Sequence, residues 1–218
     1  MSYKCAVFDM DGTILDTLLD IYNSINYALK ENGFPERSIE EVRMFVGNGL
    51  MRLVELAVPE GTPPEKIKKV GEMLIPYYIA HSGETTRVYP GIIELLKKLR
   101  EAGIKTAVVS NKTDAGVQDL VKIYFDGLFD AAMGENEKAG IKKKPNPEMT
   151  MNVLGQLGMK PEDAVYIGDS DVDIATARNS GLDEILVDWG FRGHEFLEEQ
   201  GAKRIVSSTD EVYDIIIK

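Results

Sequence analysis

The stretch 4–16, Lys-Cys-Ala-Val-Phe-Asp-Met-Asp-Gly-Thr-Ile-Leu-Asp, determines how the rest of the chain is interpreted. Its apolar run at 5–8 is typical of a short strand buried on both faces of a sheet. Asp9 and Asp11 follow at once, and two carboxylates at the end of a buried strand repel each other. A hard divalent cation such as Mg²⁺, which prefers oxygen ligands, would hold them together.

Gly12 permits a sharp turn whose backbone N–H groups can face an anion, so the same place suits a phosphate. An ordinary turn at the end of a strand is the competing interpretation, because Asp and Gly are common turn residues. The remaining motifs of the chain are therefore needed to decide between a metal site and a turn.

The overall composition excludes several classes of partner. The chain has 218 residues and a formal net charge of −11, and we find no basic stripe, which argues against nucleic acid and anionic membranes. Cys5 is the only cysteine, so no internal disulfide is possible. No apolar stretch reaches the length of a membrane span and no signal-peptide pattern is present. We expect a soluble, cytoplasmic protein with no membrane partner, present as a monomer or homodimer.

The pattern of apolar residues changes along the chain. Helical spacing fills residues 15–85 with no convincing strand, whereas predicted strands at 104–109, 131–133, 164–167, 184–187 and 204–206 alternate with helices. Such alternation is typical of a parallel sheet covered by helices on both faces. The predicted fold class is α/β, with a Rossmann-like parallel sheet core (1–14 and 86–218) and an inserted all-helical cap domain (15–85).

Polar side chains collect where the predicted strands end, which is where ligands of parallel sheets bind. Besides the first acidic pair, the candidate site residues are Ser110, Asn111, Asp169 and Asp173, which follow strands, and Lys144, which lies just before a helix. Simpler interpretations exist, since Ser110-Asn111 could cap the next helix and a run of lysines usually faces solvent. A calcium loop starting at Asp169 is excluded, because Ile174 and Ser180 occupy the places of its Gly and Glu.

The motifs together resemble those of the haloacid dehalogenase superfamily of phosphohydrolases, over essentially the whole chain. The first motif matches 9–13, the second Ser110-Asn111, the third Lys144-Pro145 and the fourth 168–173. The helical insertion looks like the helical-cap branch of this family. The stretches 46–49, 89–91 and 188–191 look most like its phosphoglycolate phosphatase group.

The resemblance implies a role for each motif residue. Asp9 would attack phosphorus and form an aspartyl phosphate, and Asp11 would act as general acid and base. Mg²⁺ would contact Asp9, the backbone carbonyl of Asp11, and Asp169. Ser110, the Asn111 backbone and Lys144 would hold the phosphate, and Asp173 would orient Lys144 or a metal-bound water.

In the cap, the loop Gly47-Asn48-Gly49 is the candidate substrate-facing segment, and Arg52 is a candidate partner for a substrate carboxylate. A plain turn between helices explains the loop equally well.

The predicted function is a Mg²⁺-dependent phosphatase that acts on a small phosphorylated metabolite, with 2-phosphoglycolate as one candidate. A phosphosugar mutase of the same fold and a non-catalytic phosphate-binding regulatory module are the alternatives. Dehalogenases of the superfamily lack an acid two residues after the nucleophile, so Asp11 favours phosphoryl transfer.

Overall fold

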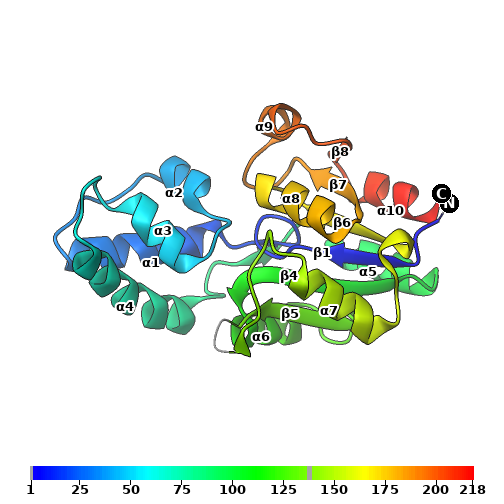
Figure 1. Ribbon diagram of the computed structural model, residues 1–218, viewed down its shortest axis with the longest axis horizontal. Coiled ribbons are helices and arrows are strands. Elements are labelled where there is room, and N and C mark those ends of the chain that lie inside the picture. The colour runs from blue at the N-terminus through cyan, green and yellow to red at the C-terminus, as the bar shows by residue number, and fades with distance from the viewer. Residues whose placement is uncertain (1, 137–138) are drawn as a thin grey trace. The chain divides into compact units, whose positions relative to one another are not determined.

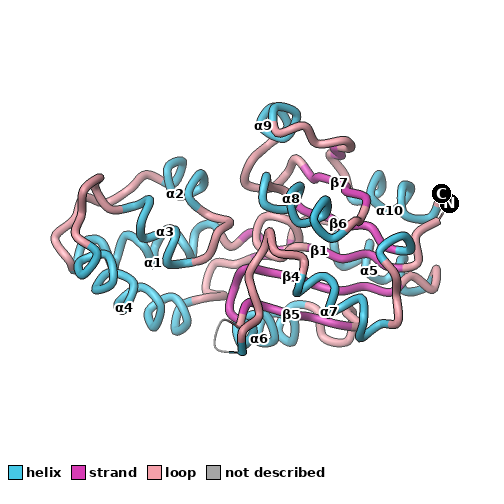
Figure 2. Tube along the Cα trace, in the orientation of Figure 1, coloured by secondary structure: helices cyan, strands magenta, loops and turns pink. Residues whose placement is uncertain are grey.

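The computed structural model describes residues 2–136 and 139–218. The chain divides into two compact units, Met1–Leu15 with Val88–Lys218, and Asp16–Arg87. We call them the core unit and the helical unit. Figure 2 shows that all the long strands belong to the core unit and that helices joined by loops make up the helical unit.

The core unit is built on a six-stranded parallel sheet with the order β5-β4-β1-β6-β7-β8. Its strands are β1 (Cys5–Phe8), β4 (Lys105–Thr113), β5 (Ala131–Glu135), β6 (Ala164–Gly168), β7 (Asp183–Val187) and β8 (Ile205–Val206). The chain adds strands first on one side of β1 and then on the other, so the order reverses beside β1. The predicted α/β class with a parallel sheet is confirmed (Figure 1).

Helices cover both faces of this sheet, which explains the continuous apolar run in β1. Ala6 and Phe8 pack in a cluster with one set of helices, whereas Cys5 and Val7 pack in a second cluster with another set. The first set is α5 (Ile92–Glu101), α6 (Asp114–Tyr124) and α10 (Thr209–Ile217), and the second is α7 (Glu148–Leu157) and α8 (Asp171–Ser180). A smaller cluster joins α9 (His194–Glu199) to β7, and a 3₁₀ turn, η2 (Pro161–Asp163), precedes β6.

Strand β4 is longer than the sequence pattern predicted. It continues past Val109 to Thr113, with a register shift against β5 between Ser110 and Thr113. The helix cap is Thr113, whose side chain accepts a hydrogen bond from the Gly116 N–H. Ser110 and Asn111 therefore lie within the strand extension, and the interpretation of them as the cap of the next helix is wrong.

The helical unit contains α1 (Leu18–Glu31), α2 (Ile39–Phe45), α3 (Leu50–Ala57) and α4 (Pro64–His81). Ser38 and Glu41 form a capping box at the start of α2. The two segments that lead into and out of this unit, β2 (Leu15–Asp16) and β3 (Arg87–Val88), pair as a two-stranded sheet. Among the described residues, no helix is long and apolar enough to span a membrane.

A buried carboxylate ties the two ends of the helical unit together. Asp20, in the first turn of α1, is only 3% exposed. Its two oxygens accept hydrogen bonds from the backbone N–H groups of Gly83, Thr85 and Thr86 and from both threonine hydroxyls. Charge-assisted bonds of this kind compensate for the burial of the carboxylate. They hold the start of α1 against the segment that follows α4.

Candidate active site

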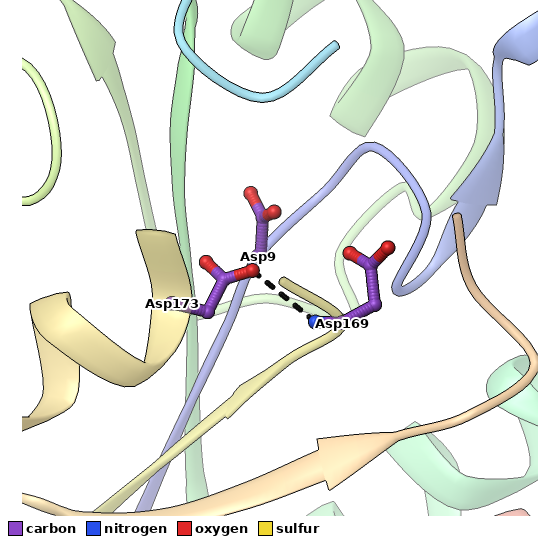
Figure 3. A group of neighbouring side chains, drawn as sticks. All are labelled: Asp9, Asp169 and Asp173. Atoms are coloured by element: carbon purple, nitrogen blue, oxygen red, sulfur yellow. Dashed lines mark hydrogen bonds between the residues drawn. The ribbon is translucent and has the colours of Figure 1, made fainter. Parts of the chain in front are cut away.

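Three carboxylates meet at the carboxyl edge of the sheet (Figure 3). Asp9 follows β1, Asp169 follows β6, and Asp173 lies in the first turn of α8. Strands β1 and β6 are parallel neighbours with Phe8 opposite Ile167, so the residues after them are brought side by side. One oxygen of each carboxylate lies within 4.8 Å of the others, and all three residues are buried.

Lys144 supplies the positive charge in this cluster. Its Nζ lies 2.7 Å from Asp9 Oδ1 and 2.9 Å from Asp173 Oδ1, and its side chain is only 3% exposed. Burial works to lower the pKa of Lys144, but the charges of Asp173 and Asp9 outweigh it and hold this pKa well above its usual range. The ammonium therefore remains a fixed positive charge beside Asp9.

Asn111 fixes the backbone of Lys144 with both ends of its amide. The Asn111 Oδ1 accepts a hydrogen bond from the Lys144 N–H at 2.6 Å, and its Nδ2 donates to the Lys144 carbonyl at 3.1 Å. The peptide bond from Lys144 to Pro145 is cis. The sequence motif predicted a role for the Asn111 backbone only. Apart from its position at the end of a strand, nothing in the sequence indicated that the Asn111 side chain would bind the Lys144 backbone.

Asp173 is saturated with hydrogen bonds. Its Oδ1 accepts from Tyr166 Oη and Lys144 Nζ, and its Oδ2 accepts from the Asp169 N–H and from the N–H and Oγ of Ser170. The bond from the Asp169 N–H is the dashed line in Figure 3. A carboxylate with this many donors has little capacity left for a cation. Asp173 therefore anchors Lys144 and the turn after β6.

Asp169 has a different environment. Its Oδ1 accepts a hydrogen bond from Thr13 Oγ1 at 3.0 Å, and its Oδ2 accepts one from the Phe191 N–H at 2.7 Å. Burial raises the pKa of Asp169 to about 7, and the nearby Asp173 charge adds to this effect. Each oxygen retains acceptor capacity, so Asp169 and Asp9 offer the oxygen donors that suit a hard divalent cation. Such an ion would also neutralise the repulsion between them.

Asp11 is paired with Lys112, a lysine outside the four sequence motifs. The Nζ of Lys112 lies 3.2 Å from Asp11 Oδ1, and the two side chains are 7% and 17% exposed. The backbone N–H of Lys112 donates to the Oγ of Ser110, which is itself buried. Side chains alternate along an extended strand, so residues 110 and 112 lie on the same side. This alternation was the one feature of the sequence that could have indicated a place for Lys112 beside Ser110.

The remaining predicted residues belong to the helical unit. Gly47 and Gly49 both have positive φ angles, of 123° and 85°, in the turn between α2 and α3 that also contains Asn48. Arg52, in α3, pairs with Glu55 at 2.7 Å. Since these residues and the acidic cluster belong to different units, contact of Gly47, Asn48, Gly49 and Arg52 with a substrate stays a prediction.

Comparison with known proteins agrees with this architecture. The pattern of the haloacid dehalogenase-like hydrolase family matches residues 6–187. A phosphoglycolate phosphatase of Aquifex aeolicus is 32% identical over 189 residues, 86% of each chain, and one of Psychrobacter arcticus is 29% identical over 100% of this chain and 97% of its own.

A crystal structure from Lactobacillus delbrueckii subsp. bulgaricus, named provisionally as a phosphoglycolate phosphatase, has the same fold. It is 40% identical, covers 100% of this chain and 99% of its own, and superposes with a TM-score of 0.95. The chain belongs to the haloacid dehalogenase-like hydrolase family.

Proposed function

We propose that this chain is a Mg²⁺-dependent phosphatase that hydrolyses a small phosphomonoester through an aspartyl-phosphate intermediate. The observation that carries the proposal is the position of Lys144, a buried ammonium 2.7 Å from Asp9 in a cluster that also contains Asp169 and Asp173. A carboxylate repels an anionic substrate, and a fixed positive charge beside it makes an approach to phosphate electrostatically feasible.

In this proposal Asp9 is the nucleophile. One of its carboxylate oxygens forms a bond to phosphorus as the ester P–O bond breaks, and the leaving oxygen takes a proton from Asp11. Asp11 then takes a proton from the water that attacks the aspartyl phosphate, which releases inorganic phosphate and restores Asp9. Ser110 Oγ, the Asn111 backbone and Lys144 Nζ would hold the phosphate oxygens during both steps.

Asp9, the Asp11 carbonyl and Asp169 would hold Mg²⁺, and Asp173 would support the site from outside. Bound there, Mg²⁺ would supply positive charge that screens the phosphate and polarises its oxygens. The donor chemistry supports this assignment, because carboxylate and carbonyl oxygens suit Mg²⁺ and the described residues 2–136 and 139–218 place no histidine or cysteine in the acidic group.

The proposed substrate to test first is 2-phosphoglycolate. The support for it comes from relatives that carry the name phosphoglycolate phosphatase, at 32% and 29% identity over most of this chain. An enzyme that acts on 2-phosphoglycolate must also bind the carboxylate of this substrate. Arg52 and the turn Gly47-Asn48-Gly49 are the proposed contacts, and Lys112 is a second cation beside Asp11.

The decisive experiment measures phosphate release from 2-phosphoglycolate, p-nitrophenyl phosphate and a panel of sugar phosphates, with Mg²⁺ and then with a chelator. We expect turnover that requires the metal and that falls by at least about 1,000-fold in Asp9→Asn, since the amide cannot act as the nucleophile. The change is nearly isosteric, so circular dichroism should show an unchanged fold. Wild-type rates in this variant would show that Asp9 is not the nucleophile.

The same panel separates the proposal from its competitors. Rearranged sugar phosphate without release of free phosphate would identify a mutase instead. Binding of phosphate with no turnover of any ester would identify a non-catalytic phosphate-binding module.

A further inference from the structure

The segment 188–191 after β7, Asp-Trp-Gly-Phe, has no part in the proposed reaction, yet it lies against Asp169, the proposed metal ligand. The Phe191 N–H donates to Asp169 Oδ2 at 2.7 Å. Gly190 lies so close that a Cβ there would be 2.3 Å from Asp169 Cβ and 2.5 Å from its Oδ2. Only glycine therefore lets the segment lie directly against this carboxylate.

The indole of Trp189 reaches the other oxygen of Asp169 through one intermediate residue. Its Nε1–H donates to the backbone carbonyl of Thr13 at 3.1 Å, and the Thr13 hydroxyl donates to Asp169 Oδ1 at 3.0 Å. Thr13 is completely buried, so both of these hydrogen bonds lie away from bulk solvent. Both oxygens of Asp169 are thus held, one by Phe191 and one by Thr13, which Trp189 fixes.

The turn that carries Thr13 also lies directly against Asp169. Gly12 has a φ of 90°, and a Cβ at that position would lie 2.4 Å from Asp169 Oδ2. The backbone after Asp11 therefore passes against the Asp169 carboxylate, and a small displacement of Thr13 would rotate that carboxylate. A hydrogen bond to the Thr13 carbonyl from a separate segment restricts that displacement.

We propose that Trp189 is a positioning residue for Asp169, which fixes its carboxylate through Thr13 in the orientation that binds the divalent cation. The inference rests on the proposed function, in which Asp169 is a ligand of Mg²⁺. Hydrogen-bond partners outside a metal site orient the ligands, and their loss typically weakens metal binding by about 10- to 100-fold. Trp189 is also the only tryptophan of the chain, so its fluorescence can report on this site.

The test compares direct Mg²⁺ binding, by isothermal titration calorimetry, in the wild type and in Trp189→Phe. This change keeps an aromatic ring in the apolar cluster where Trp189 packs and removes only the N–H donor and part of the ring. We expect the Mg²⁺ dissociation constant to rise by about 10-fold. The kcat at saturating Mg²⁺ should return close to the wild-type value, because no reacting atom is altered.

Tyr3→Phe is the matched control. It also removes the hydrogen bonds of an aromatic side chain of the core unit, because Tyr3 Oη donates to Asp183 at 2.7 Å and accepts from Arg204 at 3.5 Å. Tyr3 lies ahead of β1, at the opposite end of the strands. Its Mg²⁺ affinity should equal that of the wild type. Equal weakening in both variants would assign the effect to general destabilisation and overturn the proposal.

A second measurement needs no change at Trp189. Titration of the wild type with Mg²⁺ should change the emission of Trp189, and Asp169→Asn should abolish that change. Wild-type Mg²⁺ affinity in Trp189→Phe, or an emission that stays constant while calorimetry shows binding, would overturn the positioning role alone. Absence of Mg²⁺ binding in the wild type would overturn the metal assignment of the proposed function as well.

Discussion

At the residue scale, burial determines the chemistry of the acidic side chains. The pKa of Asp169 is raised to about 7 by burial and by the Asp173 charge, whereas an unfolded aspartate titrates near 4. Between about pH 4 and pH 7 the folded chain therefore binds a proton that the unfolded chain has lost. The stabilisation from this proton is complete below the unfolded pKa and is lost as the pH rises through about 7. A bound cation reverses that loss, because it favours the ionised carboxylate.

The upward shift of the Asp169 pKa predicts how the stabilisation by Mg²⁺ depends on pH. The rise in Tm on addition of MgCl₂ should be larger at about pH 8.5 than at about pH 6, since protons compete with the metal for Asp169 at the lower pH. Differential scanning fluorimetry at the two pH values measures it. Asp169→Asn is the control and should show little rise at either pH. An equal rise at both pH values in the wild type would contradict the assignment.

At the element scale, the end of β4 is shaped by its neighbour β5. A Cβ on Gly134 of β5 would lie 2.6 Å from the Lys112 carbonyl oxygen and from the backbone N of Asp114. The absence of a side chain there permits the strand extension that carries Ser110, Asn111 and Lys112 to the site. The site therefore depends on a glycine in a neighbouring strand.

We expect Gly134→Ala to be destabilising and to lower turnover. Overpacking costs about 1–3 kcal/mol, and the backbone at Lys112 must shift to relieve it. Gly155→Ala is the matched control, because a Cβ at this helical position meets no atom within 4 Å. That change should stabilise the chain by up to about 1 kcal/mol and leave turnover unaltered. Urea unfolding and phosphate release measure both effects, and equal stability of the two variants would refute this account.

At the scale of the whole molecule, each unit has its own buried residues. The helical unit buries apolar side chains of its own helices, among them Ile25 and Leu29 of α1 and Leu74 of α4, all 0% exposed. The acidic cluster belongs wholly to the core unit. We therefore expect the proposed metal binding and the packing of the helical unit to be separable.

Leu74→Ala tests this separation. Loss of a buried leucine should destabilise the helical unit by about 2–5 kcal/mol, because the removed side chain leaves a cavity. Mg²⁺ binding by the core unit should keep its wild-type affinity in calorimetry at a temperature where the chain is folded. A large loss of Mg²⁺ affinity in the folded variant would show that the two properties are coupled.

The elements were largely predictable because their signals are local. Apolar runs located the strands of the sheet, and helical spacing located the helices between them and those of the helical unit. The length of β4 was not predictable, because its continuation to Thr113 depends on the space left by Gly134. The polar residues that follow Val109 do not indicate from their own types whether the strand continues.

The sequence by itself determined which chemical groups follow the strands, namely Asp9 and Asp11, the Ser110-Asn111 pair, and Asp169 with Asp173, and that Lys144 precedes a helix. Parallel pairing then makes their meeting at one edge an expectation from pattern alone. Only the tertiary structure decided how each group is partnered. Lys112 pairs with Asp11, the Asn111 amide holds the Lys144 backbone, and Trp189 reaches Asp169 through Thr13. Such contacts depend on distances between segments far apart in the chain, which residue types and spacing do not fix.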